Sequence, residues 1–184
     1  MPEKTRQKTG KGFKMDFKLR SWKKEDADAL AEYANNYEIA KNLMNVFPHP
    51  YTKEDGIKFI ENNLKQNPVR VFAIEIDGKA SGAIGIFPQH DIMCKNAELG
   101  YWLAEPFWGR GIITKAIRQI TEYGFKTWDI NRIYARPFGH NIASQKALEK
   151  AGFRLEARLD KTFYKFGEFH DELIYAIRKN DIKQ

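Results

Sequence analysis

The sequence is poor in the features that mark several classes of protein. Its 184 residues include one cysteine, Cys94, so no intrachain disulfide can form, and a reducing compartment such as the cytoplasm is expected. No apolar run approaches the ~18–20 residues that a membrane-spanning helix needs. The opening segment, MPEKTRQKTGKGFK, contains no apolar stretch that could act as a secretion signal. These absences predict a soluble cytoplasmic protein with no membrane partner.

The chain also lacks the patterns of a metal site and of a P-loop. His49, His90, His140 and His170 are widely spaced and form no ligand pattern, so we expect surface or loop histidines and no metal ion. No glycine-rich segment is followed by Gly-Lys-Ser or Gly-Lys-Thr, which excludes nucleotide binding by a P-loop.

The net charge of +7 admits two interpretations. Lysine and arginine number 31 against 24 acidic residues, which would suit RNA, membrane headgroups or a phosphorylated ligand. Such a charge also serves solubility, and we favour that interpretation, which makes a nucleic-acid partner unlikely. Residues 1–16 carry five basic side chains and two acidic ones, so nearly half of the charge lies there. The sequence therefore predicts a flexible basic leader, residues 1–14, before one domain over residues 15–180.

Apolar periodicity predicts the order of the secondary structure. Alternating patterns indicate strands at 17–22, 69–76, 79–87, 97–104, 132–138, 153–159 and 169–177. Helical patterns indicate helices over 24–45 with a possible break at Asn35-Asn36, from Thr52 to before Asn67, from Ile112 onward, and from Asn141 to Gly152. Asp77-Gly78 is typical of a tight hairpin turn. Because strands and helices do not alternate regularly, we expect a mixed α/β fold with a central, largely antiparallel sheet flanked by helices, and no doubly wound nucleotide fold.

The segment Trp108-Gly109-Arg110-Gly111-Ile112-Ile113-Thr114 lies between a predicted strand and a long helix. Glycines let the backbone approach a ligand closely, and a helix start offers unpaired N–H groups to an anion such as a pyrophosphate. The same glycines could serve only the geometry of a tight turn. The third glycine of the Rossmann fingerprint is absent.

A second segment, residues 141–153, reads NIASQKALEKAGF. Asn141 suits the N-cap of a helix, which would explain it structurally. Together, Trp-Gly-Arg-Gly and this Asn-x-x-Ser…Gly-Phe segment resemble the GNAT superfamily of N-acetyltransferases, and the resemblance covers residues 16–178. LRSW at 19–22, ELGYWL at 98–103 and FHDE at 169–172 are similar to the branch of the ribosomal-protein N-terminal acetyltransferases, which also holds small-molecule acetyltransferases.

The resemblance implies acetyl-CoA as co-substrate and a set of residues that bind it. The loop and helix start would hold the pyrophosphate, Leu103 would offer backbone groups to the pantetheine and the thioester oxygen, and Asn141 would bind the pantetheine arm or a water. Lys146 would reach a phosphate, or is a solvated helix lysine. The cofactor-binding residues expected are Leu103, Trp108, Gly109, Arg110, Gly111, Ile112, Ile113, Thr114, Asn141 and Lys146. Ile113 stands where the superfamily usually has Gly or Ala.

Glu98 and Ser144 are the candidate catalytic residues. Glu98 precedes the loop on its strand, on the same face as Gly100 and Trp102, and the resemblance implies a general base there. A half-exposed surface carboxylate is the alternative. Many superfamily members carry a tyrosine that protonates the leaving thiolate where this chain has Leu148, so Ser144 is the substitute candidate.

The expected function is acetyl transfer to a primary amine by direct attack, the acceptor being a peptide or protein N-terminus or a small molecule. Segments 46–53 and 89–96 would shape the acceptor site. Aromatic residues that could line it, or belong to the core, are Tyr101, Trp102, Phe107 and Trp108. The missing tyrosine favours an alternative, a noncatalytic CoA-binding sensor, and the charge suggests a third, an RNA- or ribosome-binding protein. The oligomeric state, monomer or homodimer, stays open.

Overall fold

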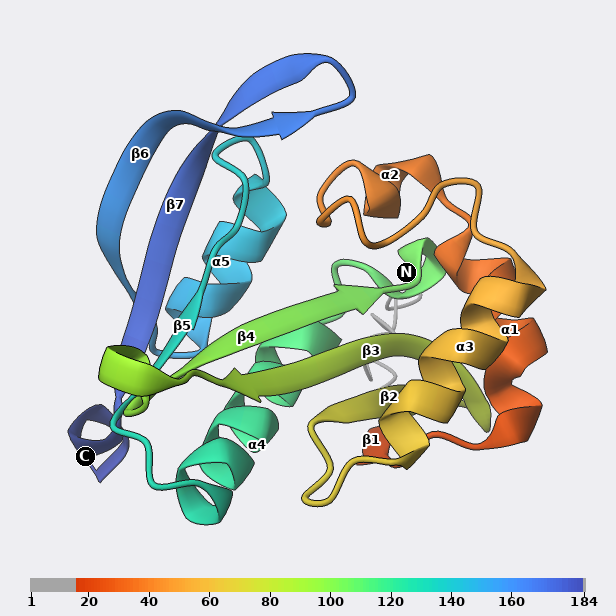
Figure 1. Ribbon diagram of the computed structural model, residues 1–184, viewed down its shortest axis with the longest axis horizontal. Helices are drawn as coiled ribbons and strands as arrows, with labels where there is room; N and C mark the ends of the chain where they lie inside the picture. The colour runs from red at the N-terminus through yellow and green to blue at the C-terminus, as the bar shows by residue number, and fades with distance from the viewer. Residues whose placement is uncertain (1–15, 184) are drawn as a thin grey trace, which may run out of the picture.

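A seven-stranded sheet organises residues 16–183, which are the residues that the computed structural model describes (Figure 1). The basic leader expected at 1–14 lies outside them. The spatial order is β1-β2-β3-β4-β5-β7-β6, and every neighbouring pair is antiparallel except β4 and β5. The strands are β1 (Phe17–Arg20), β2 (Val71–Ile76), β3 (Lys79–Pro88), β4 (Asn96–Leu103), β5 (Arg132–Ala135), β6 (Arg154–Lys165) and β7 (Glu168–Arg178). The predicted mixed fold with a largely antiparallel sheet is confirmed.

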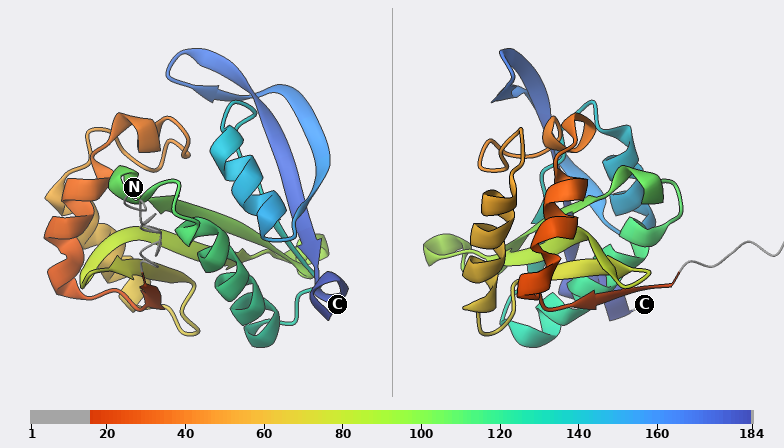
Figure 2. Two further views of the ribbon diagram at one scale, coloured as in Figure 1. Left: turned by 180° about the vertical axis from the view of Figure 1, so that it is seen from behind. Right: turned by 90° about the vertical axis from the view of Figure 1, so that its right-hand side faces the viewer.

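Helices cover both faces of this sheet (Figure 2). They are α1 (Ala27–Ala34), α2 (Tyr37–Ala40), α3 (Lys53–Leu64), α4 (Ile112–Thr127) and α5 (Ile142–Lys150). Side chains alternate along β3, so Ile84 packs with Ile117 of α4 in one core, while Ala83 packs with Leu30 of α1 in another. Leu148 of α5 belongs to the first core. The α1–α3 face and the α4–α5 face are therefore the two sides of the sheet.

The helix predicted over 24–45 is interrupted where the sequence suggested. α1 ends at Ala34, and the Asn36 side chain accepts a hydrogen bond from the N–H of Glu38 (2.8 Å), which starts α2. Beyond Ala40 the chain forms turns, so the prediction of helix through residue 45 is wrong. Met44, an apolar residue of this segment, is 67% exposed, so it does not belong to the buried face that a helix here would have.

The last two strands are longer than the sequence predicted. They extend to a two-residue turn at Phe166 and Gly167, both with positive φ, instead of stopping at residues 159 and 169. β6 shifts its register between Leu159 and Phe163, with Lys161 in a left-handed conformation. This irregularity interrupts the alternation by which the strand would have been recognised. β5 is shorter than predicted and ends at Ala135.

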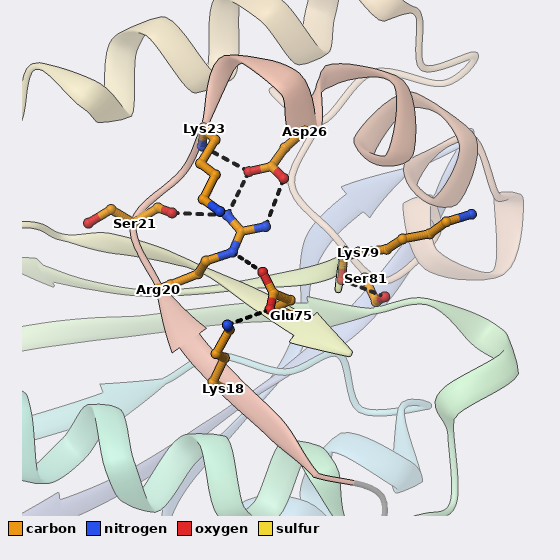
Figure 3. Close-up of polar contacts among 8 residues, drawn as sticks. All are labelled: Lys18, Arg20, Ser21, Lys23, Asp26, Glu75, Lys79 and Ser81. Atoms are coloured by element: carbon orange, nitrogen blue, oxygen red, sulfur yellow. Dashed lines mark hydrogen bonds and ion pairs between the residues drawn. The ribbon is translucent and has the colours of Figure 1, made fainter. Parts of the chain in front are cut away.

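An ion-pair network fastens the edge strand β1 to its neighbours (Figure 3). The Arg20 guanidinium donates two hydrogen bonds to the Asp26 carboxylate (2.7 and 2.8 Å) and a third to Glu75 on β2. The Lys18 ammonium lies 2.8 Å from the other Glu75 oxygen. Lys18 and then Arg20 hold the pKa of Glu75 at about 2. Burial acts to raise the pKa of Asp26. The hydrogen bonds from Arg20 and from the Lys23 N–H, together with the charges of these two residues, outweigh burial and keep the pKa below its usual value.

We expect Arg20→Met to lower the free energy of unfolding at pH 7 by about 3 kcal/mol, because two buried carboxylates lose a cation. The folded-state pKa values of Asp26 and Glu75 are depressed, so their contribution is complete at neutral pH and is lost as the pH falls. The stability difference between wild type and variant should therefore shrink between about pH 5 and pH 2 in urea titrations.

Lys126→Met is the control for this measurement, because the Lys126 side chain is 79% exposed and its carboxylate partner is 3.9 Å away. It should change stability by less than about 0.5 kcal/mol. An Arg20→Met effect that is equally small, or that is the same at pH 2 as at pH 7, would contradict the role of the network.

Candidate active site

The site begins where two neighbouring strands separate. β4 and β5 pair in parallel at only three positions, from Asn96 opposite Arg132 to Glu98 opposite Tyr134. β4 then continues to Leu103, whereas β5 ends at Ala135 and the chain turns toward α5 (Figure 1). Within residues 16–183, no strand replaces β5 along this edge of β4. The sheet is therefore split from Glu98 onward.

Backbone groups of β4 point into this split. The N–H of Ala104 donates to the Ser81 carbonyl (2.8 Å), so the even-numbered residues of β4 direct their backbone groups toward β3. The backbone groups of Leu99, Tyr101 and Leu103 therefore face the split. The Leu103 carbonyl already accepts a hydrogen bond from the indole Nε1 of Trp108 (2.7 Å). The Leu103 N–H is the group that this geometry leaves directed at a ligand.

A cavity of about 1020 Å³ fills the split. One side of it is formed by the starts of α4 and α5, and the other by residues 38–46 and the end of β6. Its volume is at the upper end of the ~300–1,000 Å³ typical of ligand pockets. It brings together all the site residues predicted from the sequence, which are Glu98, Leu103, Trp108, Gly109, Arg110, Gly111, Ile112, Ile113, Thr114, Asn141, Ser144 and Lys146.

The start of α4 has the geometry of an anion cradle. Gly109 and Gly111 have φ values of 72° and 74°, and no atom lies within 4 Å of where a Cβ would stand on either. Gly111 is the N-cap of α4, and the first turn of this helix holds no acidic residue. The first N–H groups of α4 have no partner within the helix and carry the positive end of its dipole. The residues present fit a pyrophosphate.

On the α4–α5 face of the split, two hydroxyl groups meet. The Tyr101 and Ser144 oxygens lie 2.7 Å apart. Asn141 accepts a hydrogen bond from the Ser144 N–H (3.1 Å), which confirms it as the N-cap of α5 and fixes Ser144 in the first turn. Burial raises the pKa of Tyr101 well above its usual value, so its phenol stays protonated. The sequence marks Tyr101 only as an aromatic residue that could line the site. Alternation along β4 is the signal that puts its side chain on the opposite face of the strand from Glu98.

Glu98 lies on the other face of the split. It shares that face with Trp102, whose ring is 6.0 Å from the Phe47 ring in the α1–α3 core. Burial raises the pKa of the Glu98 carboxyl, Arg136 lowers it, and Glu172 raises it again, so the net shift is upward. Arg136 itself is ion-paired with Glu172. A half-buried carboxylate with a raised pKa at the mouth of a split sheet has the properties of a general base.

The side of the cavity that faces the starts of α4 and α5 comes from segments far apart in the sequence. The Tyr37 ring stacks on Phe166 of the β6–β7 turn with centroids 5.4 Å apart. The Asn42 side-chain oxygen lies 3.0 Å from Nε2 of His140, which follows β5. Burial, followed by the charge of His170, lowers the pKa of His140. These two contacts connect the α2 region to the β5–β7 half of the sheet across the cavity.

The two segments expected to shape the acceptor site contribute little to this cavity. Of segment 46–53 only Val46 lines the cavity, and segment 89–96 does not line it at all. Residues 89–96 join β3 to β4 at the end of β4 where β5 is still paired, so they lie away from the split. Residues 163–165 of β6 take their place, and no local signal marks them, because only the return of the hairpin brings them there. Tyr101, Trp102, Phe107 and Trp108 all line the cavity.

Comparison with known proteins decides the family. A family model described as an acetyltransferase (GNAT) domain matches residues 16–154. The chain belongs to the GNAT acetyltransferase family. It is an acetyl-CoA-dependent N-acetyltransferase that transfers the acetyl group to an amine.

Three relatives illustrate this membership of the GNAT family. The chain is 29% identical to the uncharacterized N-acetyltransferase p20 of Bacillus licheniformis, over 89% of this chain and 93% of the relative. It is 33% identical to the putative ribosomal N-acetyltransferase YdaF of Bacillus subtilis (strain 168), over 57% of each chain. The crystal structure of the microcin C7 self immunity acetyltransferase MccE with acetyl-CoA and AMP is 27% identical, with a TM-score of 0.74, over 88% of this chain and 92% of that one.

Residues 16–183 lack two features that would point to other functions. They contain no group of three or more His, Cys, Asp or Glu side chains arranged to hold a metal ion. None of the helices in this part of the chain combines the length and the apolar character needed to cross a membrane.

The two roles open to Gly111, ligand approach and turn geometry, can be separated by substitution. We expect Gly111→Ala to weaken both CoA binding and thermal stability, because φ of 74° costs an alanine about 1–2 kcal/mol. Asparagine tolerates this conformation and is a good N-cap, so Gly111→Asn should keep the melting temperature. Its side chain would still occupy the cradle, so calorimetry should show CoA binding at least tenfold weaker. Wild-type CoA affinity in Gly111→Asn would mean that the glycine serves the turn alone.

Proposed function

We propose that the protein acetylates the α-amine of a peptide or protein N-terminus, with Glu98 as general base and Ser144 as general acid. The observation that carries this assignment is the position of the two groups on opposite faces of the split in the sheet. An amine entering from the α1–α3 face meets Glu98 first, and a sulfur held on the α4–α5 face lies beside Ser144. Two proton transfers of opposite direction are thus kept apart.

The remaining residues of the cavity would bind and orient acetyl-CoA, which supplies the activated acetyl group. The N–H groups at 109–114 and Arg110 would hold the pyrophosphate, with Lys146 near a further phosphate. Asn141 would contact the pantetheine arm. The edge of β4 would pair with that arm, and the Leu103 N–H would donate to the thioester oxygen as negative charge develops there.

Each step has a residue to move its proton. An N-terminal α-amine titrates near ~8, so much of it is protonated at neutral pH, and the attacking nitrogen must lose a proton, which the Glu98 carboxylate accepts directly or through a water. As the C–N bond forms and the C–S bond breaks, the Ser144 hydroxyl donates a proton to sulfur. The Tyr101 phenol, 2.7 Å away and kept protonated by its raised pKa, would hold the Ser144 hydroxyl in place, and water would replace the proton that Ser144 gives up. A thiol titrates near ~8.5, so the leaving group needs only modest help, which a hydroxyl pair can give.

The choice of an N-terminal α-amine is supported by similarity and by shape. One relative is named a putative ribosomal N-acetyltransferase, at 33% identity. The acceptor side of the cavity extends from Glu98 to residues 38–46 and 163–165, which is room for more than a bare amine. We place the reaction in the cytoplasm, because the exposed Cys94 suits a reducing compartment.

Glu98→Gln and Ser144→Ala test the two catalytic roles. We expect kcat to fall about 10²–10⁴-fold in Glu98→Gln, and 10-fold or more in Ser144→Ala, as measured by thiol release from acetyl-CoA with an N-terminal peptide. Calorimetric CoA affinity should stay within about twofold of the wild type, because neither side chain holds the phosphates. Unchanged turnover in both variants would remove the roles assigned here.

The pH profile tests whether Glu98 is the group that must be ionised. Its raised pKa means that kcat/KM declines as the pH falls through that value, since the protonated carboxyl accepts no proton. Arg136 lowers the pKa of Glu98, and Glu172 raises it, so Arg136→Met should move the acidic limb of the profile to higher pH.

Arg132→Met is the matched control. This substitution also removes one positive charge, from β5, but Arg132 is not among the groups that shift the pKa of Glu98. Its acidic limb should coincide with that of the wild type on the same peptide. An acidic limb that moves equally in both variants, or in neither, would assign the limb to a group other than Glu98.

A further inference from the structure

Lys165, at the end of β6, is a buried cation without a carboxylate partner. The residue is 5% exposed and lines the cavity beside Phe163 and Tyr164. Its Nζ lies 4.7 Å from the centre of the Phe166 ring. Within residues 16–183 its ammonium group makes no hydrogen bond and no ion pair. Burial lowers the pKa of Lys165, as expected for a charge removed from water without compensation.

The other cations on this side of the cavity are neutralised. Lys41 forms an ion pair with Glu38 at 2.5 Å, and Arg136 forms one with Glu172. Glu168 stands directly opposite Lys165 in the hairpin, yet it is exposed, and no ion pair joins the two. A buried charge that the protein does not pair is costly unless something else supplies the partner. The acceptor is the molecule that enters this part of the cavity.

A continuous wall connects Lys165 to the proposed base. Glu98 lies within the electrostatic reach of Arg136, the Arg136 guanidinium lies 5.4 Å from the Phe163 ring centre, and Phe163 is two residues from Lys165 on β6. Two residues of strand span about 7 Å. The whole path from Glu98 to Lys165 is longer than this last step, so an acceptor whose amine is at Glu98 meets Lys165 with a group beyond its own α-carbon, and the residue that follows is the first that can supply one.

We propose that Lys165 selects acceptors with an anionic group, a carboxylate or a phosphate, on the residue that follows the acetylated amine. This inference rests on the proposed function and adds the class of peptide to it. It also predicts that polycations are poor acceptors, since their second charge would meet an ammonium group instead of a carboxylate.

Matched peptides test the selection through kcat/KM for thiol release from acetyl-CoA. Ala-Asp-Gly-amide is compared with Ala-Asn-Gly-amide, and Ala-phosphoSer-Gly-amide with Ala-Ser-Gly-amide, so each pair differs by one anion. We expect a preference of about 10- to 100-fold for the anionic member of at least one pair, which is the usual effect of a hydrogen bond to a charged group. The pair with the larger ratio distinguishes carboxylate from phosphate.

Three variants then assign the preference to this side chain. Lys165→Met and Lys165→Gln should bring the ratio close to one, and Lys165→Arg should keep most of it. Lys126→Met, which removes an exposed lysine far along α4, should leave the ratio unchanged. We also expect Lys165→Met to melt at or above the wild-type temperature, because it removes an uncompensated buried charge.

The outcomes separate the two proposals. Equal rates on both members of both pairs would overturn the selection by Lys165 and leave the acetylation of N-termini standing. A preference that survives in Lys165→Met and Lys165→Gln would assign it to another residue and also overturn the inference. A wild-type protein that acetylates none of the four peptides would overturn the proposed acceptor class, and this inference with it.

Discussion

The parallel pairing of β4 and β5, and its end at Glu98, is the constraint on which the rest of the site depends. Two parallel strands that separate leave an unpaired edge of backbone, and in water such an edge is a binding surface. Here the edge faces a cavity whose opposite end is a helix start with two left-handed glycines. One divergence of two strands thus leaves the open channel in which the proposed mechanism places the extended arm of acetyl-CoA.

Because side chains alternate along β4, the two faces of the split carry different functional groups. Tyr101 faces α5 and meets Ser144, while Glu98 and Trp102 face the α1–α3 core. A base and an acid on the same face would share a proton, whereas on opposite faces they meet different substrates. The alternation of side chains along one short stretch of β4 therefore separates the two proton transfers of the proposed mechanism.

Features of the structure that depend on neighbouring residues could be predicted from the sequence, whereas features that depend on distant segments could not. The helix start at Thr52, the turn at Asp77-Gly78 and the N-cap Asn141 all form as predicted, because each depends on a few neighbouring residues. The presence of residues 163–165 at the cavity could not be predicted, because it depends on where the β6–β7 hairpin returns. Lys165 gave no sequence signal for the same reason, since the Phe166 ring beside it stacks on Tyr37, more than a hundred positions away in the chain.

In the proposed mechanism the acid comes from a different position than the tyrosine of many GNAT proteins. Leu148, which stands where many GNAT proteins carry a catalytic tyrosine, is fully buried in the core and does not line the cavity. A phenol reaches the cavity all the same, from Tyr101 on β4, and its oxygen lies 2.7 Å from the Ser144 hydroxyl. If Ser144 is the immediate donor and Tyr101 its positioning residue, then Tyr101→Phe should lower kcat less than Ser144→Ala does. The reverse order would make the tyrosine the acid, and the difference from other GNAT proteins would then be only which strand or helix carries it.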